Sequence, residues 1–221
     1  MFEAVIFDMD GLMVDTEKVW TVCKQQCCEQ FGFPFTTEFN DVTRGTSGKT
    51  FAQKVEEYCA SHGHEGVDGW EYLRVVWGIA DAAFENGGIE KKPGLDAVLA
   101  WCKENDVPRA VASGSTQAQI KHHLELVGLE GAFTMETSGF DIEWSKPAPD
   151  IFLKAARQLG SEPARTVVLE DSSNGIKAAV AGGFIPILVP DREDPKNSAG
   201  LYRFMCHDLF EVRDLFASGA V

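Results

Sequence analysis

Residues 4–11 read AVIFDMDG, and the architecture of the chain follows from them. The apolar half is unbroken and holds two β-branched residues, which is typical of a strand buried on both faces of a parallel sheet. The strand would end at Asp8 and Asp10, before Gly11, which permits a sharp change of direction. Ligands bind at the carboxyl ends of strands in open α/β sheets. Two carboxylates there repel each other unless a cation lies beside them, and such hard oxygen ligands suit Mg²⁺.

The same aspartates suit group transfer as well as metal binding. Residues i and i+2 of an extended stretch can face one crevice, so Asp8 would act as a nucleophile and Asp10 would transfer protons. An ordinary turn is the alternative, because Asp and Gly are favoured in turns for local hydrogen-bonding reasons. The four residues DMDG do not separate these two interpretations, and the choice depends on segments downstream.

Composition places the chain among ordinary globular proteins. Of its 221 residues, 44% are hydrophobic and 24% are charged, which allows a sizeable core in one large domain or in a domain with a smaller insert. The net charge of −14 argues against a nucleic-acid partner. We find no stretch of roughly 20 apolar residues that would span a bilayer, and no basic segment typical of a signal peptide, so we expect a cytoplasmic protein with no membrane partner. The six cysteines lack metal-site spacing and are expected to be reduced thiols.

A helical block follows the first strand. Residues 16–31 carry apolar side chains at helical spacing, and Gly32 ends this helix. As far as residue 87 the sequence contains no convincing buried strand and shows two further apolar helical faces. We therefore predict a small all-helical cap domain at 16–87, inserted into an α/β core domain formed by 1–15 and 88–221.

Strands and helices alternate in the remainder of the chain. Short strands are expected at 107–112, 131–136, 166–169 and 186–189, and helices at 95–105, 116–127, 149–159, 175–181 and 209–216. Ser115 is expected to cap the second of these helices. The alternation is typical of right-handed βαβ units and predicts a doubly wound parallel sheet.

Polar clusters follow three of the expected strands, and a fourth lies in a loop. They are Asp8 with Asp10, Ser113-Gly114-Ser115, Glu170-Asp171, and the loop from Ser145 to Asp150. Because the carboxyl ends of parallel strands share one edge, the four clusters can converge. Phosphoryl transfer needs an in-line nucleophile, a metal that neutralises phosphate charge, and hydrogen-bond donors for the phosphoryl oxygens. The combined set offers all of these.

Each residue of the set has a role in this scheme. Asp8 is the nucleophile, Asp10 the acid and base, and Ser113 a hydroxyl donor to the phosphoryl group. Lys146 binds phosphate and keeps Asp8 ionised. Asp171, with Glu170 beside it, completes the Mg²⁺ site. Taken singly, the serine could be a helix cap, the lysine a surface residue and the acidic pair a helix start. Taken together and in this order, they favour the catalytic interpretation.

The same segments resemble the four motifs of the haloacid dehalogenase-like hydrolases, in the branch that includes β-phosphoglucomutases and small sugar-phosphate phosphatases. The residues concerned are FDMDGLMVDTE from Phe7, SKPAPDIF from Ser145 and LEDSSNG from Leu169. The resemblance covers essentially the whole chain and implies a Rossmann-like core with a helical cap. It further implies an aspartyl-phosphate on Asp8, with Mg²⁺ held by Asp8, the backbone carbonyl of Asp10, and Asp171.

The cap is expected to choose the leaving group. The β-phosphoglucomutases carry a histidine five residues after the counterpart of Asp15, whereas this chain has Trp20, which favours a phosphatase over a mutase. Trp20 would pack in the cap core or stack on a substrate ring. Arg44 and Lys49 could bind a second anionic group or sugar hydroxyls, or lie in a solvated loop. Trp144 could line the entrance.

The predicted function is hydrolysis of small phosphorylated metabolites, sugar phosphates among them, by a monomer that uses Mg²⁺. Gly114 and Ser115 complete the expected substrate-binding set. One alternative is a β-phosphoglucomutase-like isomerase. Another is a phospho-accepting signalling domain, which the helical insert and the spacing of Asp8 and Asp10 disfavour. The five histidines lie away from the clusters and are expected to face solvent.

Overall fold

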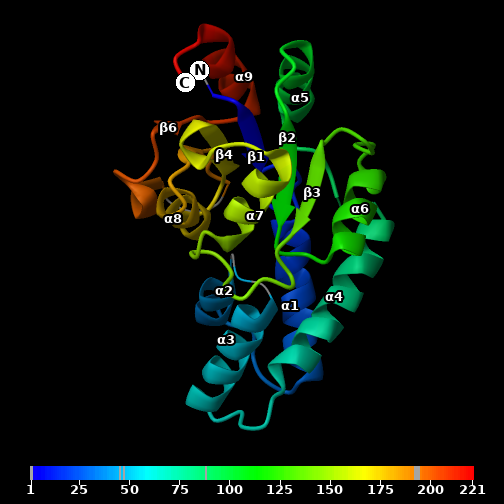
Figure 1. The fold of residues 1–221 in the computed structure, drawn as a ribbon. Coiled ribbons are helices and arrows are strands. Elements are labelled where there is room, and N and C mark those ends of the chain that lie inside the picture. The colour runs from blue at the N-terminus through cyan, green and yellow to red at the C-terminus, as the bar shows by residue number, and fades with distance from the viewer. Residues whose placement is uncertain (1, 45, 47, 88, 192–194) are drawn as a thin grey trace.

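The computed structural model describes residues 2–44, 46, 48–87, 89–191 and 195–221, and a parallel six-stranded sheet lies at its centre. The strand order is β3-β2-β1-β4-β5-β6. The strands are β1 (Ala4–Phe7), β2 (Arg109–Ser113), β3 (Met135–Ser138), β4 (Thr166–Glu170), β5 (Ile185–Leu188) and β6 (Phe204–Met205). The predicted doubly wound parallel sheet is therefore confirmed (Figure 1).

Strand β1 lies in the middle of the sheet because both of its faces are apolar. Val5 pairs with Arg109 on one side and with Val167 on the other, and the whole strand is buried. The direction of strand progression reverses between β1 and β4, which is the topological switch point where ligands bind in such sheets. Asp8 follows β1, Glu170 ends β4 and Asp171 follows β4, so the acidic residues lie at this point.

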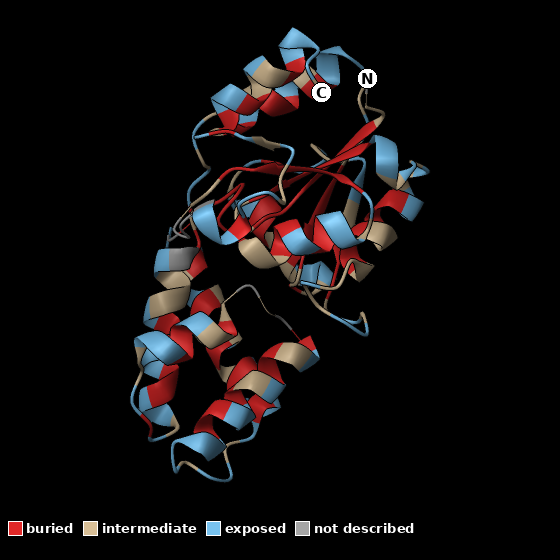
Figure 2. Ribbon diagram, turned by 90° about the vertical axis from the view of Figure 1, so that its left-hand side faces the viewer, coloured by how far each residue is buried: buried red, intermediate tan, exposed pale blue. Residues whose placement is uncertain are grey.

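Helices cover both faces of the sheet. Successive residues of β1 face opposite layers, so Val5 and Phe7 belong to one apolar core and Ile6 to the other. Helices α5 (Leu95–Glu104), α6 (Gln117–Leu126) and α9 (Leu209–Ser218) contribute to the first core, while α7 (Asp150–Leu159) and α8 (Ser173–Ala181) contribute to the second. The strands form a buried layer between them (Figure 2).

The helices and strands that the structure describes between β1 and α5 are all helices: α1 (Glu17–Gln30), α2 (Thr37–Thr43), α3 (Gly48–Ser61) and α4 (Gly69–Glu85). They pack together beyond the carboxyl edge of the sheet (Figure 1). Tyr72 of α4 lies at their centre, fully buried, and its hydroxyl donates to the backbone carbonyl of Lys24 in α1 at 3.1 Å. The arrangement agrees with a helical cap, while the limits 16–87 stay a prediction, and residues 1 and 88 lie outside the described residues.

Three details of the sequence-based assignment were wrong. Thr116, not Ser115, caps α6, because its hydroxyl accepts from the backbone N–H of Gln119 in a capping box. The third strand begins at Met135, later than expected, and β6 was missed because two residues carry no periodic signal. All six cysteines are free and buried. In the part of the chain that the structure describes, no helix has both the length and the apolar character needed to cross a membrane.

Candidate active site

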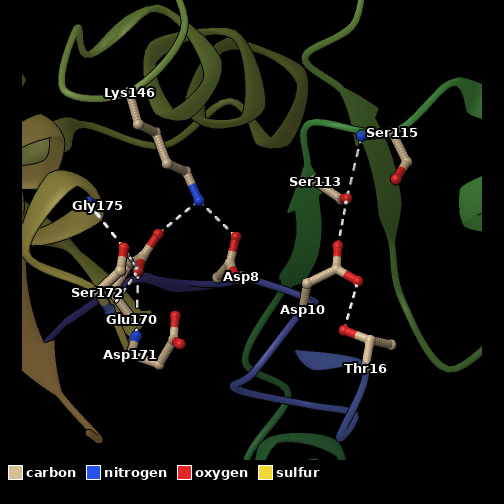
Figure 3. A network of polar contacts seen from close by, with 10 residues as sticks. All are labelled: Asp8, Asp10, Thr16, Ser113, Ser115, Lys146, Glu170, Asp171, Ser172 and Gly175. Carbon is tan, nitrogen blue, oxygen red and sulfur yellow. Dashed lines mark hydrogen bonds and ion pairs between the residues drawn. The ribbon is translucent and has the colours of Figure 1, made fainter. Parts of the chain in front are cut away.

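Asp8 lies directly after the central strand, in a loop that turns back at once. Its backbone N–H donates to the carbonyl of Leu169 at 3.1 Å, which extends the pairing of β1 with β4 by one residue. Gly11 then adopts a φ of +89°, a conformation that favours glycine, and its N–H donates to Val14 at 2.9 Å. This turn places Asp8 and Asp10 at the end of the sheet (Figure 3).

Lys146 joins two buried carboxylates. Its ammonium donates to Asp8 and, at 2.5 Å, to Glu170 (Figure 3). Burial alone would lower the pKa of Lys146, but the two carboxylates raise it above its ordinary value, so the side chain stays charged. Burial raises the pKa of Asp8, with Glu170 and Asp10 acting in the same direction, and the Lys146 cation opposes that rise. Lys146 therefore favours the ionised form of Asp8.

Glu170 is fully buried and both of its oxygens have partners. One accepts from Lys146, and the other accepts from the backbone N–H groups of Asp171 and Ser172, each at 3.1 Å, and from the Ser172 hydroxyl at 3.0 Å. The Ser172 hydroxyl also accepts from the N–H of Gly175 and so caps α8. The start of α8 thus fixes the carboxylate that holds Lys146.

Asp10 belongs to a second network, in which its partners are hydroxyls rather than a cation. Thr16 donates to one carboxylate oxygen at 2.8 Å, and Ser113 donates to the other at 3.2 Å. The Ser113 oxygen in turn accepts from the backbone N–H of Ser115 at 3.2 Å. Asp10 is thereby oriented by residues from β2 and from the start of α1 (Figure 3).

An acidic cluster at the switch point has the chemistry of a magnesium site. Asp8, Glu170 and Asp171 each offer a carboxylate oxygen, and these oxygens lie within 4.8 Å of one another. Hard, anionic oxygen donors are those that Mg²⁺ prefers. A Cβ added to Gly11 would collide with an Asp171 carboxylate oxygen, so the turn and this carboxylate are closely fitted. The donor set therefore fits the metal, with the Asp10 carboxylate directed elsewhere.

A cavity of about 150 Å³ separates these groups from the helical segment. Its core side includes Asp8, Asp10, Gly114, Ser115, Lys146 and Asp171, and its helical side includes Trp20, Lys24, Arg44 and Trp77. Ser113 and Glu170 lie behind the wall, buried. Most of the residues selected from the sequence thus meet at one cavity, and all of the expected core residues lie at it or directly behind it.

Comparison with known proteins agrees with this geometry. The family model of the haloacid dehalogenase-like hydrolases matches residues 5–189. The chain belongs to this family. It is 32% identical over 193 residues to a probable pseudouridine-5'-phosphatase of Drosophila melanogaster, in a match that covers 84% of this chain and 80% of the relative. It is 30% identical over 196 residues to hexitol phosphatase B of Escherichia coli (strain K12), with 87% of each chain covered.

The fold is likewise that of solved haloacid dehalogenase-like structures. A β-phosphoglucomutase from Clostridium difficile superposes with a TM-score of 0.85 over 99% of this chain and 96% of that one, at 20% identity. At that identity the likeness concerns the fold alone. The family resemblance drawn from the four motifs is confirmed by the family model described above.

Two of the three substrate-binding residues expected in the helical segment of this hydrolase line the cavity, and the third does not. Trp20 lines the cavity, and its ring lies 5.9 Å from that of Phe84 in an edge-on contact. Arg44 lines the cavity as well. Lys49 is exposed, is absent from the described cavity lining, and lies over the ring of Trp144 at 5.7 Å. Gly45 and Ser47, which stand between Arg44 and Lys49 in the sequence, lie outside the described residues.

Sequence reasoning missed two features of the haloacid dehalogenase-like site. Lys24 and Trp77 line the cavity, yet no motif marked either residue. The expectation that all histidines face solvent was wrong for His123, which is 1% exposed and packs on Phe84 at 4.7 Å. Its Nε2 lies 3.9 Å from the Asp81 carboxylate of α4. The contacts with Phe84 and Asp81 come from α4, and the sequence of α6 alone gives no sign of them.

Proposed function

We propose that this chain is a Mg²⁺-dependent phosphatase of small phosphorylated metabolites, sugar phosphates among them. The observation that carries the proposal is the Asp8 carboxylate, held by Lys146 within the acidic cluster and lining the cavity. A carboxylate in such a place is a nucleophile with a cation beside it, and phosphoryl transfer depends mainly on positioning and charge. The curated relatives named above are phosphatases, which supports the same conclusion.

The reaction would proceed in two displacements. An Asp8 oxygen attacks phosphorus and the bond from phosphorus to the leaving oxygen breaks, while the Asp10 carboxyl gives its proton to that oxygen. Water then attacks the aspartyl-phosphate, Asp10 takes up the proton, and phosphate leaves with Asp8 restored. The hydroxyls of Thr16 and Ser113 orient Asp10 for both steps. Lys146 stabilises charge on Asp8 and on the phosphoryl oxygens.

The magnesium site would use the acidic cluster. Asp8 and Asp171 are the proposed side-chain ligands, with Glu170 close by and the Asp10 carbonyl contributing as the family resemblance implies. When bound, Mg²⁺ supplies positive charge that offsets phosphate charge. Glu170 already accepts from four donors. Its main proposed role is therefore to position Lys146, in addition to any contact with the metal.

The test is phosphate release from a panel of phosphate esters, with and without Mg²⁺. We expect metal-dependent release by the wild type and none by Asp8→Asn, while Asp214→Asn, at a side chain 67% exposed on α9, is the matched control. Activity retained by Asp8→Asn would refute the mechanism. For Asp10→Asn we expect a burst of p-nitrophenolate from p-nitrophenyl phosphate without turnover, because this leaving group needs no proton.

A mutase is the alternative that the panel must exclude. The likeness to a β-phosphoglucomutase extends to the fold. Position 20, where the family resemblance implies a histidine in a mutase, holds a tryptophan that packs against Phe84. Isomerisation of β-glucose 1-phosphate without net phosphate release would favour the mutase over the phosphatase. The cytoplasmic location and the monomeric state stay predictions, which cell fractionation and sedimentation would test.

A further inference from the structure

Two tryptophans line the cavity from the helical segment. Trp20 comes from α1 and Trp77 from α4, and both side chains are half-buried. In the described part of the chain each indole contacts one other aromatic ring, Phe84 for Trp20 and Phe140 for Trp77, and neither pair is stacked. One such contact occupies at most one face of an indole. Each tryptophan can therefore offer a face of its ring to a ligand in the cavity.

Trp77 belongs to an apolar surface that also lines the cavity. Residues three and four apart share one face of a helix, so Leu73, Val76 and Trp77 face the cavity together. Phe51 of α3 lines the cavity as well, and it is buried, as are Leu73 and Val76. Buried apolar side chains change their conformation little, because the interior around them is close-packed. This part of the wall is therefore a firm apolar surface against which part of a ligand can pack.

The polar side chains of the same wall already have partners within the protein. The Thr43 hydroxyl donates to a backbone carbonyl of its own helix at 2.8 Å, and the Thr46 hydroxyl donates to the carbonyl of Thr43, also at 2.8 Å. The Lys24 ammonium donates to the Asn40 side chain at 3.0 Å, and Arg44 likewise interacts with other groups of the chain. Enclosing a hydroxyl without a hydrogen-bond partner costs free energy. The wall therefore suits an apolar ring better than the many hydroxyls of a sugar.

We propose that Trp20 and Trp77 bind a planar aromatic ring carried by the leaving group. This inference rests on the proposed phosphatase function and narrows its substrates to phosphate monoesters whose alcohol bears such a ring, as a nucleoside does. Aromatic rings attract one another in offset-stacked and edge-to-face contacts, and every nucleobase has a face that can stack on an aromatic side chain. Trp77 is the main specificity-determining residue, because it belongs to the apolar surface and packs against Phe140 of the core at 5.1 Å.

Two matched pairs of substrates test the inference. Uridine 5′-phosphate and ribose 5-phosphate differ in the base, and benzyl phosphate and cyclohexylmethyl phosphate differ in whether the ring is planar and aromatic. All four are esters of primary alcohols, so each leaving group needs the same proton from Asp10. We expect the wild type to have the higher kcat/KM for the aromatic member, by about 5- to 150-fold in the first pair and about 2- to 10-fold in the second. If the wild type prefers the aromatic member of neither pair, the inference is overturned.

Variants at position 77 make the result specific to the aromatic ring. Trp77→Leu keeps an apolar side chain and should lose most of the preference, whereas Trp77→Phe should keep part of it. Trp70→Leu is the matched control and should keep the wild-type preference, since Trp70 also lies on α4 and contacts Phe140 but is 48% exposed and lies outside the described cavity lining. Thermal unfolding shows whether Trp77→Leu is folded, and if it is not, Trp20→Leu takes its place. A folded variant that keeps the wild-type preference overturns the inference.

Affinity measurements separate this inference from the proposed function. Calorimetry on Asp8→Asn gives the dissociation constants of both members of each pair without turnover. Tighter binding of an aromatic member that is lost when Trp77→Leu is added to Asp8→Asn supports the ring site, even if the wild type releases no phosphate. Equal binding of the two members in both pairs overturns it, even if phosphate release is rapid.

Discussion

Gly175 of α8 has no room for a side chain. We expect Gly175→Ala to displace Glu170, which lies buried behind the active site, and so to weaken both stability and activity. A Cβ at this position would lie far inside the 3.0 Å that such contacts essentially never cross, against the carboxyl group of Glu170. To reach ordinary van der Waals distance the carboxyl must move by roughly 1–2 Å. That movement separates it from Lys146 and from the N–H groups at the start of α8.

The magnitude follows from the four interactions of the Glu170 carboxylate. A hydrogen bond to a charged group contributes about 1.5–3 kcal/mol. Loss of two such bonds, offset by the gain of about 0.5–1 kcal/mol that alanine brings to a helix interior, lowers the free energy of unfolding by about 2–5 kcal/mol. In a chain of this size 1 kcal/mol changes Tm by about 2–4 °C. We therefore expect a Tm lower by roughly 4–20 °C.

Activity should fall as well, because Lys146 loses one of its two carboxylates and no longer holds Asp8 in place. Each 1.36 kcal/mol of lost transition-state stabilisation costs about tenfold in rate, so we expect kcat/KM per folded molecule to fall at least about tenfold. Gly78→Ala is the matched control, since Gly78 lies in α4 with no atom within 4 Å of an added Cβ. It should raise Tm slightly. Wild-type Tm and activity in Gly175→Ala would refute the reasoning.

Three further predictions concern other parts of the molecule. Gly11→Ala should weaken Mg²⁺ binding at least about tenfold in calorimetry, because the new Cβ displaces Asp171 and a φ of +89° disfavours alanine; unchanged affinity would exclude Asp171 as a ligand. Burial lowers the pKa of His123 below its ordinary 6.5, so the unfolded chain takes up a proton first as pH falls, and wild-type stability should decline below about pH 6.5. Urea unfolding from pH 5 to 8 should show a smaller decline in His123→Phe, and equal slopes would contradict this. Phe140→Ala removes a ring 5.1 Å from that of Trp77. Because an aromatic pair contributes about 0.5–1.5 kcal/mol, KM should rise severalfold. Measurements of kcat and Tm show whether the effect is local, in which case both stay near their wild-type values.

The part of the site that belongs to the α/β core could be predicted because its acidic and hydroxyl side chains lie at the ends of strands. An apolar strand followed by Asp8, and another followed by Glu170, must present these carboxylates at the same edge once the strands are parallel. The place of Lys146 could be predicted for a similar reason, since its loop precedes a helix that packs on the sheet. Local sequence carries this information because register and sheet order follow from the βαβ pattern.

The cap half could not be predicted in the same way. Helical periodicity marks Cys23 and Cys27 as buried, but whether Lys24 beside them turns inward depends on where α2 places Asn40. From the sequence, Lys49 was as good a candidate for ligand binding as Arg44, yet it lies on the surface against Trp144. Both outcomes depend on helix–helix packing, which one sequence does not specify, so the residues that select a leaving group are the hardest to identify.

The two carboxylates of the site have separate supports, and this separation links the cap to one of them. Asp8 depends on Lys146 and Glu170, which all belong to the core. Asp10 depends on Ser113 of the core and on Thr16, which precedes α1, the first helix of the cap segment. A displacement of α1 would therefore disturb the proton-transfer group and leave the nucleophile in place. On the proposed mechanism, a movement of this helical segment would therefore change protonation of the leaving group and leave in place the carboxylate that is proposed to form the aspartyl-phosphate.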